Sequence, residues 1–327
     1  MGTTLKKNSR GYYNRRTWRR SLFLPLLIFI LISTGITGCG SGKTSADDIP
    51  SASTADDTEK RDNTPKILIP SADGIKTIDN SVVTIDISHS DQGYIMAAYH
   101  GESSNVNIQV TGPDGVTYLY YISERDVYTA MPLSSGNGDY LVCVYENIEG
   151  DVYSTVLSET VNVALENEFF PFLYSNQFVY FEKDTKAIQK GAQLAKNCST
   201  DLEVVTAIYN YVTKNTEYDY DKAAAVQSPY YPDVDETLET GKGICFDYSA
   251  LMCAMLRTQR IPTRLNIGYA QDIYHAWISV YLDSMGWVDN MIQFNGTDWT
   301  LMDPTFASTG GEDFHLENDD YILMFQR

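Results

Sequence analysis

Residues 241–249 read Gly-Lys-Gly-Ile-Cys-Phe-Asp-Tyr-Ser, and they say more about the fold than any other stretch of the chain. The glycines before Cys245 supply a tight turn. The apolar residues that follow recur at the spacing of one helix face: Tyr248, Leu251, Met252, Met255 and Leu256. Cys245 is therefore predicted at the N-terminus of a buried helix, where free N–H groups and the helix dipole favour a thiolate. A backbone N–H there could also stabilise an oxyanion.

Helices are expected before this segment, and strands after it. Residues 183–197 have a helical pattern, and Thr200-x-x-Glu203 is a capping-box signature that opens a second helix. Strands are predicted over residues 263–270, 274–282, 286–294 and 297–303, with Asn295-Gly296 as a hairpin turn between the last two. Helices followed by antiparallel strands indicate an α+β domain, which we place at residues 166–327.

A thiolate nucleophile needs a base and a group that orients the base. Among four histidines, His275 has the most suitable surroundings, at the start of a strand whose apolar face is Ala276, Ile278, Val280 and Leu282. His275 and Trp277 share the opposite face, so His275 is predicted to face a cleft with Trp277 as its wall. Asp303 ends a neighbouring strand and can accept from the other ring nitrogen. Asp289 and Asp298 are rivals for that orienting role.

Four blocks of this sequence, taken in order, resemble the transglutaminase-like superfamily. They are Gly-Lys-Gly-x-Cys-x-Asp-Tyr at 241–248, Leu-Arg-x-x-x-Ile-Pro-x-Arg at 256–264, His-Ala-Trp at 275–277 and Asp-Pro-Thr at 303–305. The resemblance implies a papain-like α+β fold with a catalytic triad of Cys245, His275 and Asp303. It implies attack on a protein or peptide amide, an acyl-thioester, and release to an amine or to water. Gln227, Tyr230 and Tyr231 are candidates to reach the cleft, and the oxyanion donor stays open.

The chain departs from the family at Arg260, where the family usually has a glycine in a left-handed turn. A residue other than glycine there costs about 1 kcal/mol. The segments at 218–221 and 232–235 also resemble transglutaminase-like lipoproteins of Gram-positive bacteria. That narrower resemblance implies the outer face of a single membrane.

The N-terminus resembles an export signal. A basic region precedes an apolar run from Leu22 to Ile32, and Ile-Thr-Gly-Cys at 36–39 is similar to a bacterial lipobox. We expect a signal peptide over residues 1–38, lipid on Cys39, and a flexible linker over 39–65. The expected location is the extracytoplasmic face of the cell membrane, lipid-anchored, with the substrate at the cell surface. A plain signal peptide and an uncleaved anchor helix are the alternatives.

The charge balance excludes one class of partner. The whole chain carries a net charge of −19, and removal of residues 1–38 leaves 17 basic residues against 43 acidic ones, a net charge of −26. Such a surface repels nucleic acid, so no nucleic-acid partner is expected. Few cysteines and no C-x-x-C pair argue against a disulfide scaffold and against zinc, and no metal or cofactor is expected. Whether the acidic surface binds calcium stays open.

Residues 66–165 alternate with period two and predict an all-β domain. Strands are expected at 83–87, 106–110, 117–122, 140–145 and 159–165, with turns at 113–115 and 136–139. Short strands between regular turns indicate an immunoglobulin-like β-sandwich ahead of the α+β core.

Three functions are therefore weighed. The first is a thiol acyl-transfer enzyme, acting as a crosslinker or as a peptidase or amidase. The second is a non-catalytic surface module that binds peptide or cell-wall polymer through the same fold, with Cys245 a buried thiol. The third is an adhesin whose working part is the sandwich.

Overall fold

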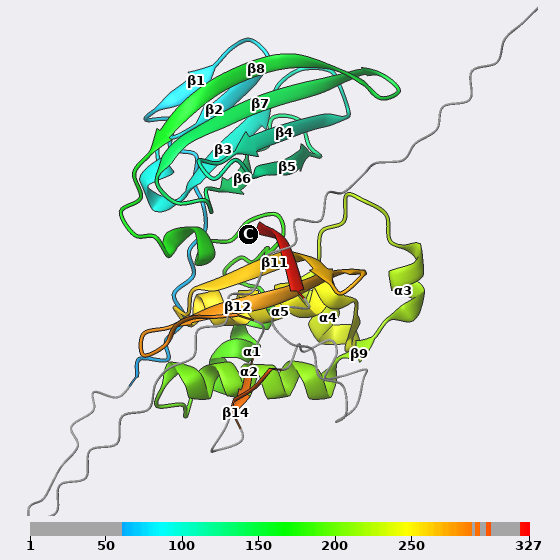
Figure 1. Cartoon of the computed structure of the whole chain (residues 1–327). Coiled ribbons are helices and arrows are strands. Elements are labelled where there is room, and N and C mark those ends of the chain that lie inside the picture. The colour runs from blue at the N-terminus through cyan, green and yellow to red at the C-terminus, as the bar shows by residue number, and fades with distance from the viewer. Residues whose placement is uncertain (1–60, 290–291, 295–298, 302–320) are drawn as a thin grey trace, which may run out of the picture. The chain divides into compact units, whose positions relative to one another are not determined.

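Two antiparallel sheets of four strands each form the N-terminal part of the computed structural model, which describes residues 61–289, 292–294, 299–301 and 321–327 (Figure 1). One sheet has the order β1-β2-β3-β6 and the other β5-β4-β7-β8. The strands are β1 (Thr77–Asp79), β2 (Val83–Asp86), β3 (Tyr94–Tyr99), β4 (Val106–Thr111), β5 (Thr117–Ile122), β6 (Thr129–Pro132), β7 (Gly138–Glu149) and β8 (Val152–Val163).

The two sheets share one apolar core, as a sandwich requires. Ile85 and Ile95 from the first sheet and Ile108 and Val144 from the second are fully buried in the same cluster. The apolar residues Val106, Ile108 and Val110 of β4 are buried, as the sequence predicts, and Asn107 between them is buried as well. The predicted β-sandwich ahead of the core is confirmed. A 3-10 turn, η1 (Ser90–Gln92), precedes β3, and a second, η2 (Phe170–Phe172), follows the sandwich.

The C-terminal part packs helices against a mixed-length antiparallel sheet of order β13-β12-β11-β16. Its elements are α1 (Lys186–Ala195), α2 (Asp201–Asn215), β9 (Glu217–Tyr218), α3 (Tyr220–Ala225), α4 (Val234–Thr240), β10 (Lys242–Gly243), α5 (Cys245–Thr258), β11 (Thr263–Ala270), β12 (Ile273–Leu282), β13 (Gly286–Val288), β14 (Ile292–Phe294), β15 (Trp299–Leu301) and β16 (Tyr321–Gln326). Figure 1 shows α5 lying between the sheet and the pair α1 and α2.

The predicted helices at 183–197 and after Thr200 and the predicted strands at 263–270 and 274–282 are confirmed, and α5 is the centre of this α+β core. The segment predicted as one strand at 286–294 forms β13 and β14 instead, and the predicted Asn295-Gly296 turn lies outside the described residues. Every α5 residue from Asp247 to Thr258 is buried. Thr200 caps α2 by accepting a hydrogen bond from the Glu203 N–H at 3.2 Å, as the capping-box signature predicts. Within the described ranges, no helix is both long enough and apolar enough to cross a bilayer.

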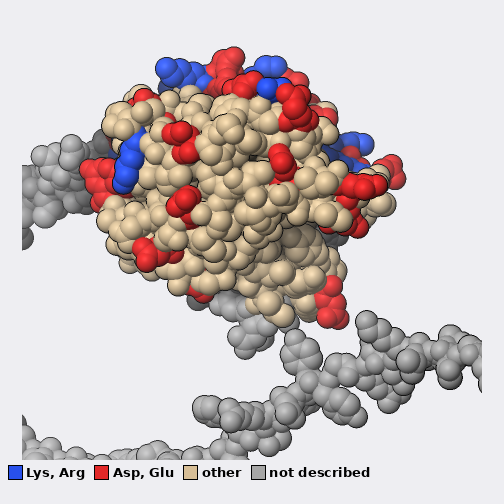
Figure 2. Space-filling view, turned by 90° about the horizontal axis from the view of Figure 1, so that it is seen from above, with Lys and Arg blue, Asp and Glu red and all other residues tan. Residues whose placement is uncertain are grey.

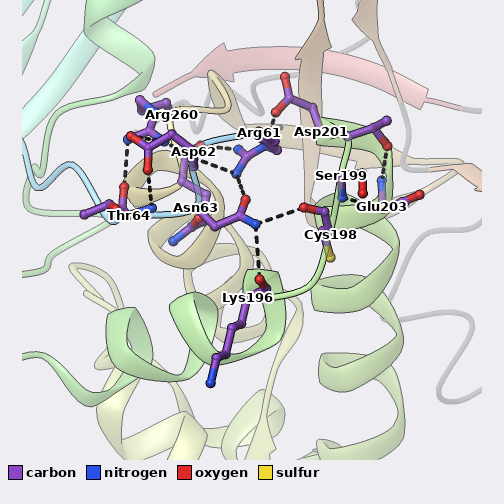
Figure 3. A network of polar contacts seen from close by, with 12 residues as sticks. Arg61, Asp62, Asn63, Thr64, Lys196, Cys198, Ser199, Asp201, Glu203 and Arg260 are labelled. Carbon is purple, nitrogen blue, oxygen red and sulfur yellow. Dashed lines mark hydrogen bonds and ion pairs between the residues drawn. The ribbon is translucent and has the colours of Figure 1, made fainter. Parts of the chain in front are cut away.

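The N-terminal segment 61–64 is bonded to the core, although it belongs to the expected flexible linker (Figure 3). Arg61 pairs with Asp201 at 2.6 Å and donates to the Gln259 carbonyl at 2.5 Å. Arg260 follows the C-terminus of helix α5, at the position where the family usually has glycine. Its φ of 64° lies in the left-handed region. Its guanidinium donates to the Thr64 carbonyl at 2.7 Å and to the Asp62 carbonyl. These contacts offset the strain of its left-handed backbone.

The charge of the surface follows the acidic composition. On the face seen in Figure 2, acidic side chains are scattered around a broad uncharged area, and basic side chains lie toward its margin. On this face the acidic side chains are therefore dispersed instead of being gathered at one place.

At Gly268 the backbone of β16 comes too close to β11 to leave room for a side chain. A Cβ at this position would lie 2.0 Å from the Ile322 carbonyl oxygen, and the β11–β16 register shifts between Ile267 and Gly268. Because the clash is with backbone, it cannot be relieved by a side-chain rotation.

We expect Gly268→Ala to displace β16 and to destabilise the protein by about 2 kcal/mol or more, the range typical of severe overpacking. Urea unfolding of the variant measures the loss. Gly150→Ala is a control for glycine loss, since open space surrounds the added methyl group there although the φ of 55° carries its own strain. Equal stability of Gly268→Ala and the wild type would contradict the close approach of the two strands.

Candidate active site

Cys245 is the first residue of α5, as the sequence predicts. Ile244 is the N-cap, and its carbonyl accepts from the Tyr248 N–H at 3.1 Å. Cys245 is half-buried, whereas the other cysteines among the described residues, Cys143, Cys198 and Cys253, are buried. Burial raises the pKa of the Cys253 thiol to about 12, so Cys253 is a packing group. Cys245 is thus the most accessible thiol in the described part of the chain.

A buried carboxylate fixes the turn that presents Cys245. Asp247 is fully buried, and one of its oxygens accepts from the Ile244 N–H at 2.8 Å and pairs with Lys222 Nζ at 2.9 Å. The other oxygen accepts from the Tyr230 hydroxyl. Lys222 Nζ also lies 4.9 Å from the centre of the Tyr230 ring. Asp247 therefore ties the start of α5 to α3 and to the loop before α4.

One cavity of about 600 Å³ is lined by both Cys245 and His275. His275 lies on β12 opposite Gly268 of β11 and is 4% exposed. The sequence points to these two residues in separate segments, and the fold brings them to one cavity. A nucleophile at a helix start and an imidazole in the same hollow are the groups that thiol acyl transfer needs.

The other predicted site residues have different outcomes. Trp277 is 3% exposed and packs against Tyr321 with ring centres 5.0 Å apart, and it is not among the described residues that line the cavity. Its ring also stacks on that of His275, with ring centres 6.3 Å apart, and its role as a cleft wall stays a prediction. Asp303 and its rival Asp298 lie outside the described residues. Asp289 is exposed and follows β13, whose Val288 pairs with Val280. That places it about four residues, or ~13 Å, along β12 from His275.

The loop between α3 and α4 forms another wall. Gln227, Tyr230 and Tyr231, which the sequence proposes as residues able to reach the cleft, all line the cavity. Pro229 in this loop follows a cis peptide bond. The prediction that this loop reaches the cleft is therefore confirmed. Lining the cavity does not by itself assign a chemical role to any one of the three residues.

Tyr218 is a functional candidate that sequence analysis missed. It lines the cavity, and burial, with the nearby Cys245 charge as the next cause, raises the pKa of its phenol to about 12. The hydroxyl therefore stays protonated at neutral pH and can donate a hydrogen bond near Cys245. Tyr218 stands in a segment rich in tyrosine and aspartate, so its residue type did not distinguish it from its neighbours in the sequence.

We expect Tyr218→Phe to lower kcat of any Cys245-dependent reaction about 10- to 100-fold if the hydroxyl donates to the oxyanion. Because the phenol pKa of about 12 lies far above the assay range, the ratio of wild-type to variant kcat should be the same across roughly pH 6 to 9. A pH–rate profile of both proteins measures this. A ratio that changes with pH, or a wild-type kcat in the variant, would remove Tyr218 from the mechanism.

Further residues line the cavity without any warning from the sequence, and three of them are large side chains close to the predicted site or at the chain's last strand. These three are Phe246, Tyr274 and Arg327, and Arg327 reaches the cavity from the end of β16. The apolar run at 321–325 could have indicated a strand, but no local pattern shows which strand β16 joins. Within the described part of the chain, no group of three histidine, cysteine or acidic side chains could hold a metal ion.

Residues 188–290 match the family model of the transglutaminase-like superfamily. The match spans α1 through β13 and includes both Cys245 and His275. The chain therefore carries a transglutaminase-like domain, preceded by a β-sandwich. At the level of the superfamily, this domain is of the papain-like thiol-enzyme type.

Similar proteins are distant. A UPF0252 protein of Methanocaldococcus jannaschii is 26% identical over 161 residues, which cover 44% of this chain and 45% of that protein. A candidate cysteine protease of Cytophaga hutchinsonii is 14% identical with a TM-score of 0.36, covering 77% of this chain and 74% of the other. Red sea bream transglutaminase is 11% identical with a TM-score of 0.29, covering 81% of this chain and 52% of the other. This chain thus spans less than half of the length of the first relative.

Proposed function

We propose that the protein is a thiol acyl-transfer enzyme with Cys245 as nucleophile, His275 as base and Asp303 as the group that orients His275. The observation that carries the proposal is the shared cavity: Cys245, half-buried at the start of α5, and His275 line the same hollow of about 600 Å³. Helix and strand segments that are separate in the sequence build it, so the pairing is not a product of local sequence.

The proposed reaction has two balanced steps. Cys245 Sγ loses its proton to His275 and forms a bond to the carbonyl carbon of an amide. The C–N bond breaks, His275 gives the proton to the leaving amine or ammonia, and an acyl-thioester remains. A primary amine or water then attacks the thioester, its proton returns through His275, and the Cys245 thiol is restored. Asp303→Asn should keep the fold and lower the rate, and full activity of that variant would remove Asp303 from the triad.

The first experiment uses residues 58–327, the unit that includes the bonded segment 61–64. The protein is incubated with glutamine-containing proteins and a biotinylated amine, with Cys245→Ala as control, and products are identified by mass spectrometry. Cys245-dependent amine incorporation identifies a crosslinking enzyme, and new termini or deamidated glutamine identify a hydrolase. Absence of any Cys245-dependent product, together with no labelling of Cys245 by dilute iodoacetamide, would favour the non-catalytic binding module.

We also propose that lipid on Cys39 anchors the chain to the extracytoplasmic face of the cell membrane, where the substrate is a surface protein or peptide. The support is the basic region, the apolar run and the Ile-Thr-Gly-Cys segment at 36–39. Radioactive palmitate supplied to cells that express the full chain should label it, and Cys39→Ser should abolish the label. Label retained in Cys39→Ser would exclude this anchor.

A further inference from the structure

Arg327 is a buried cation that faces the candidate active site without an acidic partner. Its side chain is 5% exposed and lines the cavity that contains Cys245 and His275. Four aromatic rings surround its guanidinium, with the carbon Cζ at 3.8 Å from the centre of Phe178, 4.8 Å from Tyr120, 5.5 Å from Tyr118 and 5.8 Å from Phe325. None of the ion pairs among the described residues includes it.

The hydrogen bonds of this guanidinium are also incomplete. Nη2 donates to the Leu119 carbonyl at 3.3 Å, while Nε and Nη1 are buried with no partner among the described residues. Burial lowers the pKa of Arg327, which is the sign of a charge that the surroundings do not fully compensate. An arginine nevertheless keeps its proton, so the cavity holds a positive charge.

A second buried arginine shows what a purely structural role looks like in this fold. Arg257 is 1% exposed, and each of its three nitrogen positions donates to a carbonyl: Nε to Thr263 at 3.0 Å, Nη1 to Tyr174 at 2.9 Å and Nη2 to Arg327 at 2.7 Å. Arg257 lies away from the cavity and fixes the backbone of residue 327. The contrast distinguishes Arg327 as an arginine that lines the cavity and has donors without a partner.

The charge of Arg327 is felt inside the cavity. It opposes the rise in pKa that burial causes in the hydroxyls of Tyr231 and Tyr274, both of which line the same walls. A buried guanidinium with two free donors is stabilised best by a carboxylate or a similar planar anion, which accepts two parallel hydrogen bonds. Among the described residues, no carboxylate pairs with Arg327. A bound ligand would therefore provide the carboxylate.

We infer that Arg327 is a specificity residue that binds a carboxylate of the acyl-donor substrate while Cys245 attacks a nearby amide. This inference rests on the proposed acyl-transfer function and names its substrate class. A sphere of 600 Å³ is about 10 Å across, the length of about three extended residues. The substrate is therefore a peptide in which the reacting amide lies within about three residues of a carboxylate, either a free C-terminus or an acidic side chain.

The test uses alkylating reagents that differ only in that carboxylate. N-iodoacetyl peptides of one, two and three glycines are prepared as free acids and as C-terminal carboxamides, so that the reacting carbon is the same in all of them. A further pair, iodoacetyl-glycyl-glutamate carboxamide and its glutamine analogue, places the carboxylate on a side chain. The full-length chain in mild detergent is treated with each reagent, and mass spectrometry gives the second-order rate at Cys245, with glutathione as the reference thiol.

For at least one peptide length, the acid should alkylate Cys245 about tenfold or more faster than its carboxamide, the usual effect of a hydrogen bond between charged groups. Net charge works in the opposite direction, since the chain carries −19 and repels the acids. Arg327→Met keeps an apolar side chain of similar length among the rings and should reduce the acid-to-amide ratio to about one or below. If a glycine peptide and its carboxamide show the preference, Arg327 binds a C-terminal carboxylate. If the glutamate and glutamine reagents show it, Arg327 binds a side-chain carboxylate.

Arg264→Gln is the matched control. Arg264 also stacks on rings, 3.6 Å from the centre of Trp287 and 4.8 Å from Phe172, but it does not line the cavity. Its replacement should leave the ratio unchanged. Thermal melts of both variants verify folding. The acid-to-amide ratio of the wild type tests the inference even if a variant fails to fold.

Two results would overturn the inference. One is an acid-to-amide ratio of one or less at every length in the wild type, and the other is a preference that survives in Arg327→Met. Alkylation of Cys245 by all reagents without preference leaves the acyl-transfer proposal standing and removes only the role of Arg327. Failure of every reagent to alkylate Cys245 refutes both.

Discussion

His275→Ala should lower kcat/KM of the Cys245-dependent reaction by about 10⁴-fold, while the protein keeps its fold. Loss of one member of a nucleophile–base pair removes most of the rate, because the thiol is no longer deprotonated and the leaving amine is no longer protonated. The residual rate reflects binding and oxyanion stabilisation. Amine incorporation or hydrolysis, whichever the first experiment finds, measures the effect.

His100→Ala is the matched control for this prediction. His100 lies beside the sandwich, where Nδ1 contacts Asp126 at 2.7 Å, and it does not line the cavity. Its loss should leave kcat/KM within about twofold of the wild type, since surface changes away from a site seldom exceed ±0.5 kcal/mol. A His275→Ala variant with activity within tenfold of the wild type would show that another group is the base.

Asp247→Ala is expected to destabilise the protein by about 3–5 kcal/mol and to lower activity as well. The carboxylate is fully buried, and its removal leaves the Lys222 ammonium, the Ile244 N–H and the Tyr230 hydroxyl without their acceptor. Breaking a buried pair on one side has this cost because the remaining charge is left uncompensated. Activity falls too, since Ile244 is the residue that caps α5 just before Cys245.

Chemical denaturation of Asp247→Ala, Lys222→Met and the double variant measures the free energy of the Lys222–Asp247 ion pair apart from the other hydrogen bonds of Asp247. The double variant should be more stable than the sum of the two single losses predicts, because the lone lysine charge is gone. The exposed pair of Lys186 and Glu239 is the comparison, and Glu239→Gln should have little effect. Additive losses in the cycle would mean that the Lys222–Asp247 contact contributes nothing to stability.

The parts that sequence predicted well are those set by local periodicity. The helix after Cys245, the buried apolar residues of β4 and the strand at 263–270 each depend on spacing between neighbours, and each is confirmed. The prediction that Cys245 and His275 act together depended on their residue types, on the order of the sequence blocks and on the resemblance to a family. The orienting role of Asp303 stays a prediction.

What sequence did not predict depends on non-local contacts. Alternation placed Trp277 opposite the core face, but it could not show that this face is covered too, as the buried Ser279 and the contact of Trp277 with Tyr321 of β16 show. β16 pairs with β11 across about fifty intervening residues, so no local signal brings Arg327 to the cavity. Residues 61–64 have the composition of a linker, and they are held by bonds to residues far away in the sequence, among them Asp201, Gln259 and Arg260.

The path of the chain has a mechanical consequence. Segment 61–68 bonds to the α+β core before the sandwich begins: the Lys66 N–H donates to the Thr258 carbonyl at 2.8 Å, and Leu68 bridges to Tyr174. A pull on residue 61 therefore loads those bonds and reaches α5, while the sandwich, held between Leu68 and Tyr174, lies outside the line of force as long as they hold. Optical-trap stretching from residue 61 to residue 258 should then release no length from the sandwich until those bonds break, and up to that force the domain that looks like a spacer would bear none of the tension.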